Sequence, residues 1–394
     1  MINDALLQSL HSHLAGWGLR RFTSDEAYFQ WQRETLSPAD IAALHRQVEQ
    51  KRGGSSADEV SFYDATAHPN ILPVLSSQRY DYCLAIGSRV ADRLGESRSI
   101  LDVGCGVGIL TTFYARLYPD KTLVGIDRSP ASIARAQEQA KALGLTNVRF
   151  ECLDLDHRAP TRSYDLILAT HALVQAEQDP GIPSRNWNTF ERGREKQQQA
   201  DFERRTGIGS RLDRLSALLS AQGRMIVFEK TRQLARRVPL QRAMAARDLG
   251  LIEQPELIRY RLVEEIADDG PFYVLGRGTP RQLLWDESPE PDEGRPYDRT
   301  QLKTGSNDPD APLYENHWPS AQDVWEQLDN KRLLKETTRQ EPDGRQLHVE
   351  LGQAEEWVYL YCANTFDQRQ LVIVEPSRTV MLESYYREIA CGAP

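Results

Sequence analysis

The segment of the chain that most plainly suggests chemistry is residues 101–108, which read Leu-Asp-Val-Gly-Cys-Gly-Val-Gly. A short apolar run leads into three glycines at alternate positions, and a helix is expected to follow. Glycine is needed where the backbone turns sharply and a ligand must approach without a Cβ in the way. The first N–H groups of the helix then point at that ligand. The segment therefore predicts a nucleotide-binding turn between a strand and a helix.

Two acids accompany this turn. Asp127 lies nineteen residues after Gly108, at the end of the next expected strand, where a carboxylate can accept both hydroxyls of a ribose. Asp102 lies directly before the turn, where it repels a pyrophosphate but attracts an ammonium or sulfonium group. The spacing Gly-x-Gly-x-Gly also differs from the Gly-x-Gly-x-x-Gly of dinucleotide sites. The pattern thus favours a positively charged nucleoside over a dinucleotide.

Residues 101–108 resemble the first motif of class I S-adenosylmethionine-dependent methyltransferases, an acid followed by Gly-x-Gly-x-Gly. Asp127 matches the ribose-binding acid of that family, and Asp154 matches the acid near the adenine amino group. Residues 163–167, Ser-Tyr-Asp-Leu-Ile, match the start of its fourth strand. The resemblance covers roughly residues 82–278 and implies S-adenosylmethionine as the cofactor.

The resemblance also implies a role for each matching residue. The glycines shape the turn, Asp102 supports the methionine end of the cofactor, and Leu153 packs against adenine. Asp156 is an alternative to Asp154 as the adenine acid. The full set of cofactor contacts expected in this way is Asp102, Gly104, Cys105, Gly106, Gly108, Asp127, Arg128, Leu153, Asp154 and Thr170.

His171 is the candidate catalytic residue, because it follows the fourth expected strand and ligands bind outside the carboxyl ends of strands in such sheets. A histidine there can remove a proton from a hydroxyl or an amine. The alternative is a histidine that only bonds to backbone or packs over the methionine chain. The surrounding Ala-Thr-His-Ala lacks the Asn- or Asp-Pro-Pro-aromatic motif of nucleic-acid amino-methylating family members. We therefore expect O- or N-methylation of a small molecule.

Short apolar runs alternate with helical stretches across residues 100–228, which predicts an α/β fold with a doubly wound, seven-stranded, mostly parallel sheet. Runs at 258–263 and 272–275 flank Asp268-Asp269-Gly270, whose composition predicts a hairpin turn. We expect helices before this sheet and a small C-terminal α+β module after it.

The expected regions are an N-terminal helical region or lid (1–81), the cofactor-binding domain (82–279), a linker (280–311) and the C-terminal module (312–394). Residues 175–207 form a long insertion in the domain, and long connections are often lids or binding loops. We expect this insertion, the N-terminal helices and residues 62–64, Phe-Tyr-Asp, to cover the substrate. The linker is expected from its Pro, Asp, Glu and Gly content.

Composition narrows the partners. The net charge of −9 disfavours nucleic acid, and the basic residues of 192–211 alternate with acidic ones. Five scattered cysteines indicate neither a disulfide framework nor a zinc site, so no metal is expected. No apolar run approaches the roughly 20 residues that cross a bilayer, and residues 1–19 lack a secretory layout. We therefore expect a cytoplasmic protein.

Two other functions stay open. The chain could methylate a protein, with the C-terminal module as a docking element whose edge strands pair with an extended partner. It could also sense the cofactor without turnover. The alternation of Trp357, Tyr359 and Tyr361 fits either an apolar sheet face or a partner surface, and the module could also make a homodimer.

Overall fold

The computed structural model describes residues 4–174, 179–278, 283–290, 292, 294–304, 311–342 and 344–391. The chain divides into two compact units. The first unit comprises residues 1–179, 203–232 and 240–285, and the second comprises residues 180–202, 233–239 and 286–394. The helices expected at 1–81 are therefore part of the first unit and not a separate domain.

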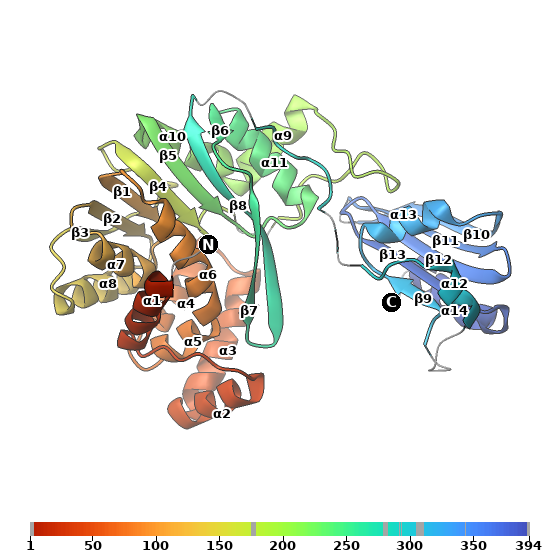
Figure 1. The fold of residues 1–394 in the computed structure, drawn as a ribbon, viewed down its shortest axis with the longest axis horizontal. Coiled ribbons are helices and arrows are strands. Elements are labelled where there is room, and N and C mark those ends of the chain that lie inside the picture. The colour runs from red at the N-terminus through yellow and green to blue at the C-terminus, as the bar shows by residue number, and fades with distance from the viewer. Residues whose placement is uncertain are drawn as a thin grey trace. The chain divides into compact units, whose positions relative to one another are not determined.

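The first unit is built on a mixed sheet in which five neighbouring strands are parallel and β8 runs antiparallel to them (Figure 1). This confirms the predicted α/β fold with a mostly parallel sheet. An additional strand, β7 (Glu256–Leu262), pairs with β8 alone. The strands along the sheet are, in spatial order, β3 (Val148–Cys152), β2 (Thr122–Asp127), β1 (Ser99–Val103), β4 (Tyr164–Thr170), β5 (Leu219–Phe228), β8 (Glu265–Arg277) and β6 (Leu249–Leu251).

Helices cover the sheet because their apolar positions pack on its buried strands. Those within and after the motif region are α7 (Ile109–Leu117), α8 (Pro130–Ala142), α9 (Lys196–Thr206), α10 (Ile208–Leu218) and α11 (Leu234–Ala245). Six helices precede the sheet: α1 (Asp4–Gly16), α2 (Asp25–Thr35), α3 (Pro38–Gly53), α4 (Ser56–Thr66), α5 (Leu72–Gln78) and α6 (Tyr80–Arg93). Leu10 and Leu14 of α1 pack in one core with Ile86 and Val90 of α6.

The predicted hairpin exists, but its turn lies elsewhere. Strands β7 and β8 join at Val263-Glu264, where Glu264 has a φ of 76°. The segment Asp268–Gly270 lies inside β8 instead. The pairing shifts from Ile258 with Gly270 to Arg259 with Asp268, so Asp269 is left without a partner across the ladder. This is a β-bulge, a feature that bends a strand and redirects a side chain.

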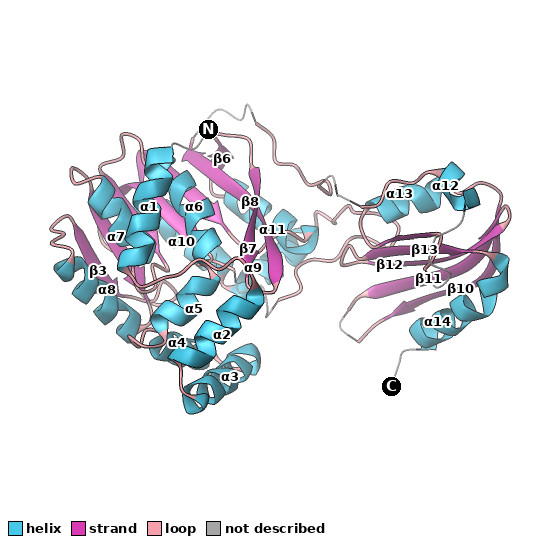
Figure 2. Cartoon of the chain, turned by 60° about the horizontal axis from the view of Figure 1, so that its bottom comes forward, coloured by secondary structure: helices cyan, strands magenta, loops and turns pink. Residues whose placement is uncertain are grey.

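The second unit is a five-stranded antiparallel sheet with helices (Figure 2). Its strands are, in spatial order, β10 (Lys331–Gln340), β11 (Gln346–Ala354), β12 (Trp357–Asn364), β13 (Arg369–Val374) and β9 (Tyr314–Asn316). Its helices are α12 (Arg299–Thr304), α13 (Ser320–Gln327), a 3-10 turn at Pro376–Arg378 and α14 (Thr379–Cys391). Trp357, Tyr359 and Tyr361 are buried in one core with Val324 of α13, so their alternation packs an apolar sheet face.

Most of the expected insertion packs within the second unit. The ring of Trp187 stacks on that of His348 with centroids 3.5 Å apart, and the fully buried guanidinium of Arg192 pairs with Asp367. This differs from the expectation of a loop belonging to residues 82–279. Residues 175–178 of the insertion lie outside the described residues.

The expected linker is partly core. Leu302 of α12 is buried with the strands of the second unit, and Arg237 pairs with Glu290. Positions 279–282, 291, 293 and 305–310 lie outside the described residues. The described part of 280–311 therefore includes a helix, α12, and Leu302 and Tyr297 pack against the core of the second unit.

Replacing Asp367 with Asn tests whether the insertion stabilises the second unit. The buried Arg192 would lose its charged partner, which costs about 3 kcal/mol of unfolding free energy. Asn also tolerates the φ of 71° at this position. Urea unfolding followed by tryptophan fluorescence measures the loss. Glu191→Gln breaks the exposed pair with Arg185 and should change stability by less than about 0.5 kcal/mol. Equal effects of the two substitutions would contradict the assignment.

Candidate functional site

The glycine turn after β1 has the backbone that its sequence requires. Gly104, Gly106 and Gly108 have φ values of 68°, 54° and 78°, which side chains disfavour. A Cβ added to Gly104 would lie 2.7 Å from the Cβ of Ala172, and one added to Gly108 would lie 2.9 Å from the Phe150 ring. A Cβ on Gly106 would meet no protein atom within 4 Å. Gly106 therefore leaves open space where the ligand is expected.

Asp127 is held against this turn. Its Oδ2 accepts a hydrogen bond from the backbone N–H of Gly106 at 2.9 Å, and its Oδ1 accepts one from Ser129 at 2.9 Å. The parallel register places Val103 beside Ile126, which brings the ends of β1 and β2 together. Burial raises the pKa of Asp127 above its usual value, although both backbone bonds oppose the change.

Asp102 is buried at the end of β1 and accepts a hydrogen bond of 2.5 Å from the hydroxyl of Thr111. Burial, together with the nearby charge of Asp127, raises the pKa of Asp102 to about 7. The same burial and both acids raise the pKa of the Cys105 thiol well above its usual value, so this cysteine is no nucleophile. A buried acid and a half-buried acid around an open turn favour a cationic ligand.

The expected adenine side follows β3. Leu153 is buried, and its N–H donates to the carbonyl of Asp127 at 2.8 Å. Oδ1 of Asp154 accepts the N–H of Asp156 at 2.8 Å. Asp156 itself is bound on both oxygens by Arg211, at 2.7 and 2.6 Å, and this lowers its pKa. Both carboxylate oxygens of Asp156, the alternative acid, are thus bonded to Arg211, which leaves Asp154 as the better candidate for the adenine contact.

Helix α4 fastens the loop after β2. Arg128 pairs with Glu59 and donates to the hydroxyl of Ser56 at 2.8 Å, so its guanidinium is committed to this helix. Asp64 accepts the hydroxyl of Ser129 at 2.6 Å and so supports the start of α8. The expected Phe-Tyr-Asp segment therefore lies against the ribose end of the site through its acid. Whether Arg128 contacts a cofactor stays a prediction.

His171 follows Thr170, the last residue of β4, and has a φ of 56°, a backbone conformation that histidine adopts at some cost. Its N–H donates to the carbonyl of Phe228 at 2.8 Å. Its ring packs against those of Tyr82 and Phe228, with centroid distances of 5.0 and 5.2 Å, and these two rings lie 6.4 Å from each other. The three rings form one aromatic cluster, which restricts the orientation of the imidazole.

Both ring nitrogens of His171 face charged groups. Nη2 of Arg79 donates to Nδ1 at 2.8 Å, while Nε2 lies 3.0 Å from Oδ2 of Asp269, without the alignment of a straight hydrogen bond. Because Arg79 can only donate, Nδ1 is unprotonated and the neutral ring carries its proton on Nε2. Burial lowers the pKa of His171 to about 4, with Asp269 opposing and Arg79 adding to the change. The base role of His171 stays a prediction.

Three residues that contact His171 or its loop escaped the sequence analysis. Glu229, directly after β5, accepts the N–H groups of Ala172, Leu173 and Val174 at 2.8, 2.9 and 3.2 Å, and so fixes the loop that carries His171. Burial raises its pKa to about 7. An acid directly after a buried strand is the available signal for Glu229. The composition around Asp269 indicates a turn instead, and no sequence signal indicates Arg79.

The comparisons with known proteins agree with this geometry. Residues 94–234 match the family model described as "Methyltransferase domain". The chain is 31% identical to a malonyl-[acyl-carrier protein] O-methyltransferase of Acetivibrio thermocellus over 24% of this chain and 35% of that protein. It is 33% identical to a trans-aconitate 2-methyltransferase of Deinococcus radiodurans over 24% and 34%. The chain thus spans about a third of the length of these curated relatives.

The first unit contains a class I S-adenosylmethionine-dependent methyltransferase domain.

Solved methyltransferase structures are similar to this domain at low identity. An N-methyltransferase from Bradyrhizobium japonicum WM9 in complex with S-adenosyl-L-homocysteine is 16% identical, with a TM-score of 0.33, over 49% of this chain and 85% of that chain. A magnesium protoporphyrin IX methyltransferase from Synechocystis PCC 6803 with bound cofactor is 13% identical, with a TM-score of 0.34, over 52% and 81%.

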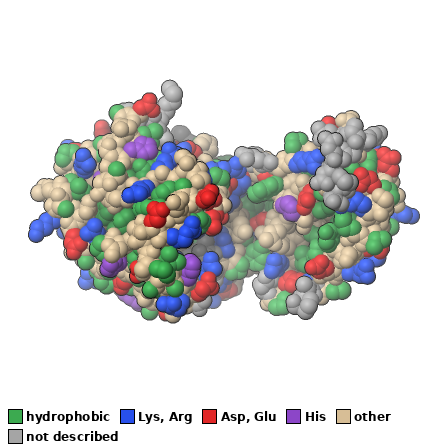
Figure 3. All heavy atoms as spheres, turned by 90° about the horizontal axis from the view of Figure 1, so that it is seen from below, with side chains coloured by type: hydrophobic (Ala, Val, Ile, Leu, Met, Phe, Trp, Pro, Cys, Tyr) green, Lys and Arg blue, Asp and Glu red, His purple; other side chains and the backbone are tan. Residues whose placement is uncertain are grey.

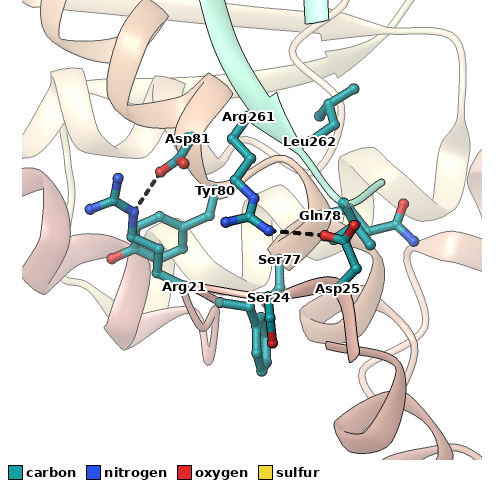
Figure 4. Close-up of a pocket in the computed structure, with 11 residues that line it drawn as sticks. Arg21, Ser24, Asp25, Ser77, Gln78, Tyr80, Asp81, Arg261 and Leu262 are labelled. Atoms are coloured by element: carbon teal, nitrogen blue, oxygen red, sulfur yellow. Dashed lines mark hydrogen bonds and ion pairs between the residues drawn. The ribbon is translucent and has the colours of Figure 1, made fainter. Parts of the chain in front are cut away.

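A separate shallow pocket lies where β7 meets the helices before the methyltransferase sheet (Figure 4). Arg261 reaches Asp25 at 3.0 Å, and Arg21 reaches Asp81 at 2.7 Å. The Arg261–Asp25 pair attaches the β7–β8 hairpin to the N-terminal helices, and the Arg21–Asp81 pair links two segments that precede the sheet.

The basic segment 192–211 forms no common patch. Besides Arg192 and Arg211, which pair with Asp367 and Asp156, Arg205 pairs with Asp179. On the face shown in Figure 3, Lys and Arg side chains likewise lie among Asp and Glu side chains. Among the described residues there is no cluster of metal ligands, and no described helix has the length and apolar character needed to span a membrane.

The pKa of Asp102 predicts how cofactor affinity depends on pH. Below about pH 7 the free domain holds this acid mainly protonated, and binding a cation requires the carboxylate. Affinity for S-adenosylmethionine should therefore rise about tenfold from pH 6 to pH 8, as measured by calorimetry. Asp102→Asn should weaken binding and flatten this dependence. Glu229→Gln removes another acid with a pKa near 7 but should keep the slope. A slope retained by Asp102→Asn would refute the assignment.

Proposed function

We propose that this protein transfers a methyl group from S-adenosylmethionine to an oxygen or nitrogen of a small molecule. The observation that carries the proposal is the pair of acids, buried Asp102 and half-buried Asp127, around the open face of Gly106. A buried carboxylate without a cation is costly, and its raised pKa measures that cost. A ligand with a positive methionine end and a ribose satisfies both acids.

The chain's residues divide the work of holding this ligand. Asp102 attracts the ammonium group, and Asp127 accepts the ribose hydroxyls. Leu153 and Asp154 provide the adenine contacts. Arg79 supplies a cation for the methionine carboxylate, because Ala172, next to its partner His171, lies against Gly104 at the methionine end of the turn.

The bound cofactor supplies an already activated methyl group. The protein's task is then to align the acceptor with the carbon–sulfur bond and to exclude water. The aromatic rings of Tyr82, Tyr260 and Phe228 meet around His171, at the carboxyl end of β4. This apolar enclosure with a few polar groups suits a small acceptor.

The names of the relatives support small acceptors among other possibilities, since one relative methylates trans-aconitate and another methylates a malonyl group on a carrier protein. A protein acceptor is the second candidate. It is favoured by β10, a ten-residue edge strand on which Leu333 and Leu334 are exposed. Such an edge can pair with an extended chain.

The ribose contact gives the most direct test of cofactor binding. Asp127→Ala removes an acceptor for two hydroxyls and also the bonds that hold Gly106 and Ser129, so affinity for S-adenosylhomocysteine should fall about 100-fold or more. Calorimetry measures the change. Asp92→Ala removes an exposed acid from α6 and should leave affinity unchanged. Equal affinity in both variants, or no binding by the unchanged protein, would overturn the proposal.

Turnover distinguishes the candidate functions. Release of S-adenosylhomocysteine should depend on a metabolite fraction of low molecular mass and not on a protein fraction. Turnover with the protein fraction alone would contradict a small acceptor and support a protein acceptor. Tight cofactor binding without turnover on either fraction would support a protein that senses the cofactor without methyl transfer.

A further inference from the structure

Arg79 holds the nitrogen through which His171 would act as a base. Its Nη2 donates to Nδ1 of His171 at 2.8 Å, and its guanidinium lies over the Tyr82 ring at 4.1 Å from the centroid. Arg79 is nevertheless exposed, whereas Tyr82 is buried. Arginine has five N–H donors, so an exposed guanidinium can bond to a ligand as well as to a ring nitrogen.

We propose that Arg79 couples cofactor binding to base catalysis: it caps Nδ1 of His171 in the free protein and transfers to the cofactor's methionine carboxylate when the cofactor binds. Nδ1 then faces the acceptor, and the His171–Asp269 pair becomes the general base. The inference rests on the proposed function, since it requires that the chain bind S-adenosylmethionine.

The transfer of Arg79 follows from the strengths of its alternative bonds. A guanidinium bonds to a carboxylate with two charge-assisted hydrogen bonds, which are about twice as strong as bonds between neutral groups. Its present partner is a neutral imidazole nitrogen. Stacking on Tyr82 lets the guanidinium slide across the ring while it keeps its contact with the aromatic face.

Asp269 is placed to support the ring once Arg79 leaves. The bulge in β8 turns its carboxylate to within 3.0 Å of Nε2, and the hydroxyl of Tyr260 also donates to it. Its backbone carbonyl accepts the N–H of Thr231, which fixes the bulge. A carboxylate on the proton-bearing nitrogen holds the tautomer with a free Nδ1 and stabilises the imidazolium that forms.

The charged and titratable groups around His171 give the direction of the effect. Burial is the largest cause of the low pKa of His171, Asp269 opposes it, and Arg79 and Lys230 lower the pKa further. Tyr82 and Tyr260 pack nearby without charge at neutral pH, because burial raises the pKa of each. Removing the guanidinium from Nδ1, with a carboxylate to neutralise it, therefore raises the pKa of His171 from its value in the free protein.

The acceptor's lone pair forms a bond to the methyl carbon, and the carbon–sulfur bond breaks with its electron pair going to sulfur. The acceptor's proton passes to Nδ1 of His171, whose Nε2–H remains on Asp269. The step suits an acceptor that must lose a proton, a hydroxyl or an N–H group, and gives no advantage to a carboxylate.

NMR titration of the imidazole signals of the full chain tests the coupling, with the His171 signal assigned by its loss in His171→Gln. S-adenosylhomocysteine should raise the pKa of His171 from about 4 by about one pH unit or more. This ligand keeps the carboxylate but lacks the sulfonium charge. Methylthioadenosine, which lacks the carboxylate, should leave the pKa unchanged. Binding of S-adenosylhomocysteine without a change in the pKa of His171 would overturn the coupling but not the proposed function. No binding at all would overturn both.

Substitutions separate the two partners of His171. Arg79→Met should raise the pKa of His171 without any ligand, abolish its response to S-adenosylhomocysteine and raise the KM for S-adenosylmethionine. Asp269→Asn should lower kcat about tenfold or more with that KM unchanged. Asp268→Asn is the matched control, because Asp268 bonds to Arg232 and Arg259 instead of His171. It should leave kcat unchanged. A normal ligand response in Arg79→Met, or equal kcat in the two aspartate variants, would overturn the proposal.

Discussion

The site depends on two carboxylates, buried Asp102 and half-buried Asp127, beside a turn whose three glycines all have positive φ values. The carboxylate of Asp102 accepts a hydrogen bond from the hydroxyl of Thr111, and that of Asp127 accepts hydrogen bonds from the backbone N–H groups of Gly106 and Ser129. Burial makes both acids harder to ionise, and the charge of Asp127 adds to this effect on Asp102. The two acids cannot move apart, because the strands that carry them, β1 and β2, are paired in parallel in the sheet. The fold therefore maintains a negative site that a cationic ligand completes.

The part of the site around His171 is built by loops whose backbone is fixed by side chains that are distant in sequence. Glu229 of the segment after β5 accepts three successive N–H groups of the loop after β4. These bonds hold His171 in its left-handed conformation, and the bulge in β8 brings Asp269 to the same ring. Strain at His171 thus persists because several neighbours determine its position. The antiparallel hairpin that supplies Asp269 is also tied to the N-terminal helices through Arg261.

The cofactor motifs could be predicted because their chemistry is local in sequence. The three glycines indicate a turn with positive φ values independently of the rest of the fold. In a parallel sheet, an acid at the end of the second strand is expected next to the loop that follows the first strand. The partners of His171 could not be predicted in this way, since Arg79 lies 92 residues away in sequence. Asp268-Asp269-Gly270 has the composition of a turn, but the hairpin turns five residues earlier, at Val263-Glu264, and this segment becomes a bulge in β8. Likewise β10 could not be predicted, because a charged edge strand lacks the alternation that buried strands show.

The acids and the histidine of the site have pKa values displaced in opposite directions, and one cause explains both. Burial disfavours charge, so it raises the pKa of Asp102 and Glu229 to about 7 and lowers that of His171 to about 4. In the free domain burial thus favours the neutral forms of these three groups. A zwitterionic cofactor would change this balance, since its ammonium favours the ionised Asp102 and its carboxylate competes for Arg79. The same ligand that completes the acid pair would then make the imidazole basic enough to accept a proton, which links affinity and catalysis through electrostatics without a change of fold.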